Sequence, residues 1–198
     1  MKWLGLVTAV IALASCTTLR GRVADNVYFS PLGDFSCHIP GFPPAKTSDA
    51  FGPYGGTIRF TEEFWFTRVD VEEFNPKIPS EMKNAKARRR VYEGYLQANL
   101  IPLVKQSVPD ASVVSQSHIE IDGKAVFASI SLLPKASNTV ESGERLDGYR
   151  GAIQYSDGNF MYVVSILDPD RPRLAREKHY EHVLARATSA FRLCAFPQ

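Results

Sequence analysis

The sequence lacks a strong excess of charge of either sign, since 23 Lys and Arg residues face 21 Asp and Glu residues for a formal net charge of +2. Nucleic-acid-binding proteins usually have a pronounced basic excess, so no nucleic-acid partner is expected. No segment reaches the roughly 20 apolar residues that a transmembrane helix needs. G-x-S-x-G, G-x-G-x-x-G and Walker motifs are also absent from the sequence, so no catalytic residue and no cofactor are assigned.

The amino-terminal residues have the pattern of an export signal. Lys2 precedes an apolar run from Trp3 to Leu13, which has the length of a signal-peptide core and is too short to span a bilayer. The run closes with Leu13-Ala14-Ser15-Cys16, which resembles the lipobox of bacterial lipoproteins. This resemblance implies lipid transfer to the Cys16 thiol, cleavage before Cys16, and acylation of the new amino terminus by a chain such as palmitate.

The lipobox also predicts a location in the cell envelope. Thr17 follows Cys16, whereas an Asp at this position tends to hold Gram-negative lipoproteins in the inner membrane. We therefore expect an outer-membrane lipid anchor with the protein on the periplasmic side, made stable by several acyl chains. The expected organisation is a signal peptide (1–15), a lipidated amino terminus and tether (16–26), and a single domain (27–198).

Two cysteines remain when Cys16 carries the lipid, namely Cys37 and Cys194. An even pair in an oxidising compartment predicts a disulfide, which would join the first strand region to the last helix. The alternative is that both are buried thiols that act as small apolar side chains.

Apolar periodicity predicts the secondary structure. Alternation and turn residues indicate strands at 27–30, 35–39, 57–60, 64–71, 111–121, 124–133, 150–155 and 160–167. Asp122-Gly123 is a strong hairpin signal. Helices are expected from about Ser80, as the N-cap, to Leu100, where Pro102 must kink or end the helix, and again near Pro172. The segment 40–56, rich in Pro and Gly, predicts a long loop.

The order of these elements predicts an α+β domain, with a mainly antiparallel sheet of about six strands packed with two main helices. The segment Tyr155-Ser156-Asp157-Gly158-Asn159-Phe160-Met161-Tyr162 and the helix end Ala187-Thr188-Ser189-Ala190-Phe191 resemble the closing hairpin and helix of PsbP-like domains. Residues 28–40 are similar to the opening extended segment of these domains. The resemblance implies an α/β/α sandwich and a binding or assembly role rather than catalysis.

Two groups of side chains are candidates for binding. His179 and His182 form an H-x-x-H pair that brings two rings within reach of one metal ion on a helix. No second cluster completes a zinc site, so no metal is assigned, and ordinary packing is the alternative. A basic stretch in the first expected helix is either a patch for anionic headgroups or an acidic partner, or a solvated face; it consists of Lys83, Lys86, Arg88, Arg89 and Arg90.

Together these features predict a non-catalytic, lipid-anchored envelope protein that serves as a periplasm-facing interaction or assembly module. Its expected contacts are the membrane, through the lipid, and an envelope protein. The alternative is a lipoprotein that binds a lipid or another small apolar ligand, with the loop 40–56 and nearby aromatic residues as a lid. A third hypothesis is a metal-dependent hydrolase that uses His179 and His182.

Overall fold

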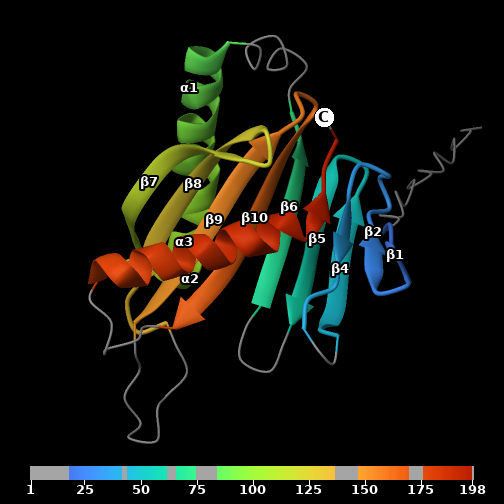
Figure 1. The fold of residues 1–198 in the computed structure, drawn as a ribbon, viewed down its shortest axis with the longest axis horizontal. Helices are drawn as coiled ribbons and strands as arrows, with labels where there is room; N and C mark the ends of the chain where they lie inside the picture. The colour runs from blue at the N-terminus through green and yellow to red at the C-terminus, as the bar shows by residue number, and fades with distance from the viewer. Residues whose placement is uncertain are drawn as a thin grey trace, which may run out of the picture.

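The computed structural model describes residues 18–41, 44–61, 66–74, 84–136, 147–169 and 176–197. Its centre is a seven-stranded antiparallel sheet with the strand order β4-β5-β6-β10-β9-β8-β7 (Figure 1). The strands are β4 (Lys46–Gly52), β5 (Gly55–Thr61), β6 (Phe66–Glu73), β7 (Ser112–Ile121), β8 (Lys124–Leu133), β9 (Gly148–Ser156) and β10 (Phe160–Pro169). A second sheet has the order β1-β2-β3-β11 and is formed by β1 (Arg22–Ala24), β2 (Val27–Phe29), β3 (Ser36–His38) and β11 (Cys194–Ala195).

Helices cover both faces of the main sheet. Helix α3 (Arg176–Arg192) crosses one face, while α1 (Ala85–Tyr95) and α2 (Ile101–Ser107) lie behind the other (Figure 1). The predicted α+β class, with an antiparallel sheet and two main helical segments, is therefore confirmed.

Strand β10 shows how the sequence builds two cores. Because successive side chains of a strand point to opposite faces, alternate residues enter different layers. Tyr162, Val164 and Ile166 pack with α3 and the small sheet, whereas Met161 and Val163 pack beneath α1 and α2. All five are buried, so β10 is the central strand of the molecule.

The first helix begins later and continues further than predicted. Asn84 caps α1, since its side-chain oxygen accepts hydrogen bonds from the backbone N–H groups of Lys86 (2.8 Å) and Ala87 (3.4 Å). The predicted N-cap, Ser80, lies outside the described residues.

The helix does not end before Pro102. A π-helical turn, Leu96–Leu100, connects α1 to α2, and the Ile101 N–H reaches back to the Leu96 carbonyl. Pro102 then lies in the first turn of α2, where a missing N–H costs little.

The predicted loop 40–56 is wrong in its central part, because Lys46–Gly52 forms β4, the edge strand of the main sheet, which pairs with β5. The sequence shows little alternation here because the first half of β4 is exposed on both of its faces. Lys46, Thr47 and Ser48 are exposed, while Phe51 is buried.

The predicted tether 16–26 also needs correction from Leu19 onwards. The Leu19 N–H donates to the Phe51 carbonyl at 3.0 Å, and β1 pairs with β2. Backbone pairing rather than apolar periodicity holds this segment, so the pattern of its side chains gave no signal. The described residues contain no helix that is long and apolar enough to cross a membrane.

Candidate functional site

The structure bonds Cys37 to Cys194, as predicted. The two residues are cross-strand partners on β3 and β11, so the bond fixes the end of the chain to the small sheet. The predicted lipid-attachment residue, Cys16, lies outside the described residues.

The structure separates the side chains of the H-x-x-H pair. His179 is 1% exposed and packs against Tyr149, with 4.4 Å between the ring centroids. His182 instead points its Nε2 towards a carboxylate oxygen of Asp168, 3.3 Å away. Within the described part of the chain, no group of three or more potential ligands could hold a metal ion. The described residues therefore bring the two rings to different partners, His179 to the core beside Tyr149 and His182 to the carboxylate of Asp168.

Asp168 is a site residue that the sequence did not indicate. It is fully buried at the end of β10, and its carboxylate lies 3.3 Å from His182 and 3.5 Å from the Arg186 guanidinium. In the sequence, Asp168 stands before a proline, and an Asp-Pro pair indicates a turn that leads into a helix rather than a buried site. The cluster ties α3 to the sheet, because both partners of Asp168 lie on α3.

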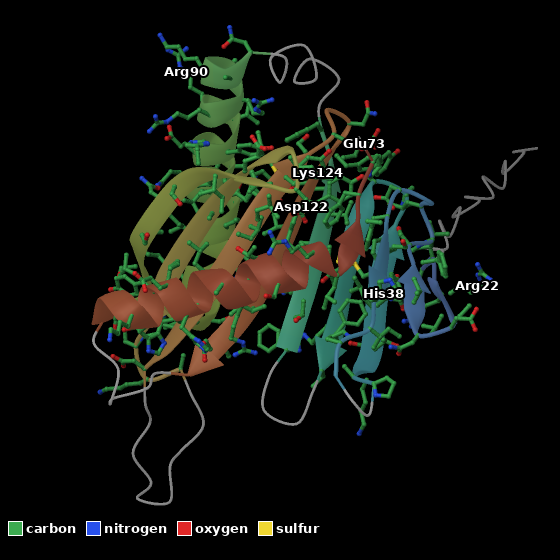
Figure 2. All side chains as sticks on the ribbon, viewed as in Figure 1. Arg22, His38, Glu73, Arg90, Asp122 and Lys124 are labelled. Carbon is green, nitrogen blue, oxygen red and sulfur yellow. A yellow bond between two sulfur atoms is a disulfide. The ribbon has the colours of Figure 1, made fainter. Side chains whose placement is uncertain are left out.

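The basic stretch forms the outer face of α1, with the exception of Lys83, which lies outside the described residues. Lys86, Arg89 and Arg90 are exposed, and Figure 2 shows Arg90 on the part of α1 that projects beyond the strands of the sheet. Arg89 pairs with Glu93 at 2.9 Å, one helical turn further on, while Arg88 is half-buried. The exposure of this stretch is compatible with both alternatives that the sequence left open, a contact patch and a solvated helix face.

A groove lies between the helical layer and the strands β5 and β6. It has a volume of about 430 Å³. One wall comes from the helices and the other from the sheet, and the lining consists of Gly56, Asp70, Val71, Glu72, Tyr95, Ala98, Asn99, Leu100, Pro102, Leu103 and Gln106. We call this feature the helix–sheet groove.

Tyr95 bridges the two walls of the groove. Its hydroxyl donates a 2.7 Å hydrogen bond to the Glu72 carboxylate on β6. Burial raises the pKa of Tyr95, and the hydrogen bond to Glu72 raises it further. The phenol therefore stays protonated and acts as a hydrogen-bond donor rather than as a base.

Asp70, on the floor of the groove, is held by two arginines. Arg68 lies 2.6 Å from one carboxylate oxygen, and Arg150 lies 4.0 Å from the other. Arg150 also donates to the Ser165 hydroxyl at 3.3 Å, and burial lowers the pKa of its guanidinium. Arg68 thus holds one Asp70 oxygen, while the other oxygen is buried, faces Arg150 and accepts no hydrogen bond from the described residues.

The chemistry of this lining suits binding. In the part of the chain that the structure describes, the groove is lined by carboxylate, amide, phenol and apolar side chains and includes no histidine, cysteine, serine or lysine. It offers amide groups from Asn99 and Gln106, the Glu72 carboxylate, and an apolar edge at Leu103, which is 40% exposed. Every second residue of β6 points to the groove side of the sheet, and three of these residues are charged. This alternation indicates a polar face and can be read from the sequence at Phe66, Arg68, Asp70 and Glu72.

No family model matches the chain, and neither does any curated protein sequence. Solved structures do match. The Ran-binding protein Mog1p of Saccharomyces cerevisiae is similar with a TM-score of 0.48 and 12% identity, over 90% of this chain and 96% of that one. The cyanobacterial PsbP protein CyanoP of Synechocystis is similar with a TM-score of 0.50 and 10% identity, over 98% of this chain and 99% of that one. The chain therefore has an α+β fold similar to that of CyanoP, in agreement with the PsbP-like resemblance of its sequence.

Proposed function

We propose that this protein is a lipid-anchored envelope protein without catalytic activity, which binds another envelope protein through the helix–sheet groove. The observation that carries the binding role is the groove itself, where an exposed apolar residue, Leu103, borders a polar lining. The lipobox-like Leu13-Ala14-Ser15-Cys16 supports the anchor and the outer-membrane location on the periplasmic side.

A protein partner fits the groove better than an apolar ligand does. Pockets for apolar ligands are usually enclosed and lined mainly by hydrophobic and aromatic side chains. This groove instead has carboxylates on its sheet side and amides along its helical side. Apolar anchors surrounded by polar groups are typical of protein–protein interfaces. The lid on which the ligand-binding alternative depended is replaced by the edge strand β4.

Site-specific photo-crosslinking in the native envelope tests the binding role. A photoreactive residue at position 103 should trap one envelope protein, and the same residue at position 105, also on α2, should not. Lys105 is exposed and lies outside the lining of the groove. In affinity capture, Leu103→Asp should lower the recovery of this partner at least tenfold, whereas Lys105→Asp should leave it unchanged.

Equal recovery of the partner with both variants would show that the partner does not bind in the groove. Covalent capture of lipid alone from position 103 would instead favour the ligand-binding alternative. Mass spectrometry of the amino-terminal peptide tests the anchor separately: acyl chains on Cys16 are expected in the wild type, and Cys16→Ala should release the protein from membranes.

A further inference from the structure

Leu19, three residues after Cys16 in the sequence, is already part of the domain, since its N–H donates to the Phe51 carbonyl on β4 at 3.0 Å. Gly21 crosses closely over Tyr28, because a Cβ at Gly21 would collide with the Tyr28 ring. Residues 19–21 are therefore held against β4 of the main sheet and β2 of the small sheet.

Asp49 on β4 holds residues 19–21 through hydrogen bonds, and we call this group of contacts the Asp49 clamp. Its carboxylate accepts hydrogen bonds from the Gly21 N–H (2.6 Å), the Arg20 guanidinium (3.0 Å) and the Tyr28 hydroxyl (2.9 Å). Burial acts to raise the pKa of Asp49, but these three donors outweigh it and lower the pKa. The clamp is therefore charged at neutral pH and holds residues 19–21 against the domain.

The clamp sets how far the domain can lie from a lipid at Cys16. Three residues span at most about 10 Å even when fully extended. An anchor at Cys16 would thus keep the surface around Leu19 next to the lipid headgroups. A long mobile tether would have left the orientation of the domain open, whereas this short one restricts it.

The surface next to residues 19–21 has the chemistry of a membrane interface. It is the face of the β1–β2 hairpin on which Arg22 and Phe29 are cross-strand partners, with Phe29 37% exposed. The Arg22 guanidinium lies over the Phe29 ring, 4.8 Å from its centroid, and Figure 2 shows Arg22 at the outer edge of the molecule, directed away from the body. Arginine and aromatic side chains suit the boundary between headgroups and acyl chains, because each combines an apolar body with a polar group.

We propose that the β1–β2 hairpin lies against the surface of the bilayer that holds the anchor, with Phe29 in the interface and Arg22 at the lipid phosphates. The orientation rests on the anchoring of the proposed function. The small sheet packs with the core on the α3 face of the main sheet, while the groove lies on the α1–α2 face. In this orientation the groove is therefore turned away from the membrane and open to a partner.

Tryptophan quenching in reconstituted vesicles tests the orientation. The acylated protein carrying Phe29→Trp is placed in vesicles of phosphatidylethanolamine and phosphatidylglycerol that contain brominated acyl chains. The matched control carries Leu103→Trp, at an exposed apolar residue on the other face of the sheet. The signal of the unmodified protein, which retains Trp65, is subtracted from both. We expect at least threefold stronger quenching at position 29.

A variant with ten Gly and Ser residues inserted between Thr17 and Thr18 measures the role of the short connection, and it should lower the quenching at position 29 by half or more. Equal quenching at positions 29 and 103, in a protein that sediments with the vesicles, would overturn the orientation alone. A protein that carries no acyl chain and does not sediment would overturn the anchor, and the orientation with it.

Discussion

The Tyr95 hydroxyl on α1 and the Glu72 carboxylate on β6 are joined by a 2.7 Å hydrogen bond across the helix–sheet groove. The bond connects the two walls at a point where the groove opens to solvent, since Glu72 is exposed. It therefore fixes the spacing of the walls and presents a charged acceptor to any partner.

Replacing Tyr95 by Phe should weaken this connection without changing the shape of the wall. We expect a loss of about 0.5–1 kcal/mol in the free energy of unfolding, at the low end for a hydrogen bond because Glu72 is exposed. Urea denaturation measures the change. Tyr54→Phe is the matched control, since the Tyr54 side chain is 73% exposed, and it should have no effect. Equal losses in both variants would contradict a role for the bond.

The buried hydroxyl of Tyr92 should make the folded protein less stable at alkaline pH. Burial raises the pKa of Tyr92 to about 12, and its hydroxyl accepts from the Ser156 N–H at 3.1 Å and donates to the Ala125 carbonyl at 3.3 Å. Because the folded state favours the neutral phenol, its contribution is complete below about pH 10 and is lost as the pH rises to about 12. A shift of this size corresponds to about 3 kcal/mol.

Denaturant titrations between pH 9 and pH 12 measure this loss. Tyr92→Phe should be less stable at pH 8, because it lacks both hydrogen bonds, and should lose less stability than the wild type over the alkaline range. A parallel decline in the two proteins would mean that other groups cause the alkaline unfolding.

Gly151 on β9 allows α3 to approach the sheet. A Cβ at this position would lie 2.9 Å from a methyl group of Val183 and 3.1 Å from the Ala187 Cβ. Gly151→Ala should therefore lower the free energy of unfolding by about 1–3 kcal/mol through overpacking. Gly94→Ala on α1 is the control, because nothing lies within 4 Å of a Cβ there, and it should raise stability by up to about 1 kcal/mol. Thermal or urea denaturation of the two variants should give changes of opposite sign.

The disulfide between Cys37 and Cys194 closes a loop with a sequence separation of 157 residues. The loop-entropy model gives a stabilisation on the order of 4–5 kcal/mol for loops of this size. Reduction should lower the midpoint of urea denaturation accordingly, and the double variant Cys37→Ala, Cys194→Ala should show no response to reductant. An unchanged midpoint after complete reduction would show that the strand pairing alone carries this stability.

The central part of the fold could be predicted because its signals are local. Asp122 and Gly123 both adopt positive φ, at 51° and 78°, as a tight hairpin turn requires, and β8 has the predicted bounds. The buried face of α3 also follows its helical spacing, with Val183, Ala187 and Phe191 in the core.

The edge strands and the site could not be predicted in the same way. Strands β1 and β4 are held by backbone pairing, and most of their side chains are exposed on both faces, so their sequences show little alternation. The groove depends on which surface the helices leave open on β5 and β6, and this is set by tertiary packing. The Asp49 clamp joins segments 28 residues apart, beyond the range of any local pattern.

The pairing of β11 with β3 has a consequence for the order of assembly during synthesis. Because a chain is made from its amino terminus, residues 36–38 appear early, yet their partners on one side are residues 194 and 195. The small sheet therefore stays incomplete, with the backbone groups of β3 open along that edge, until the carboxyl-terminal segment is available to pair. Strands near the start of the domain are thus among the last to gain their final hydrogen bonds.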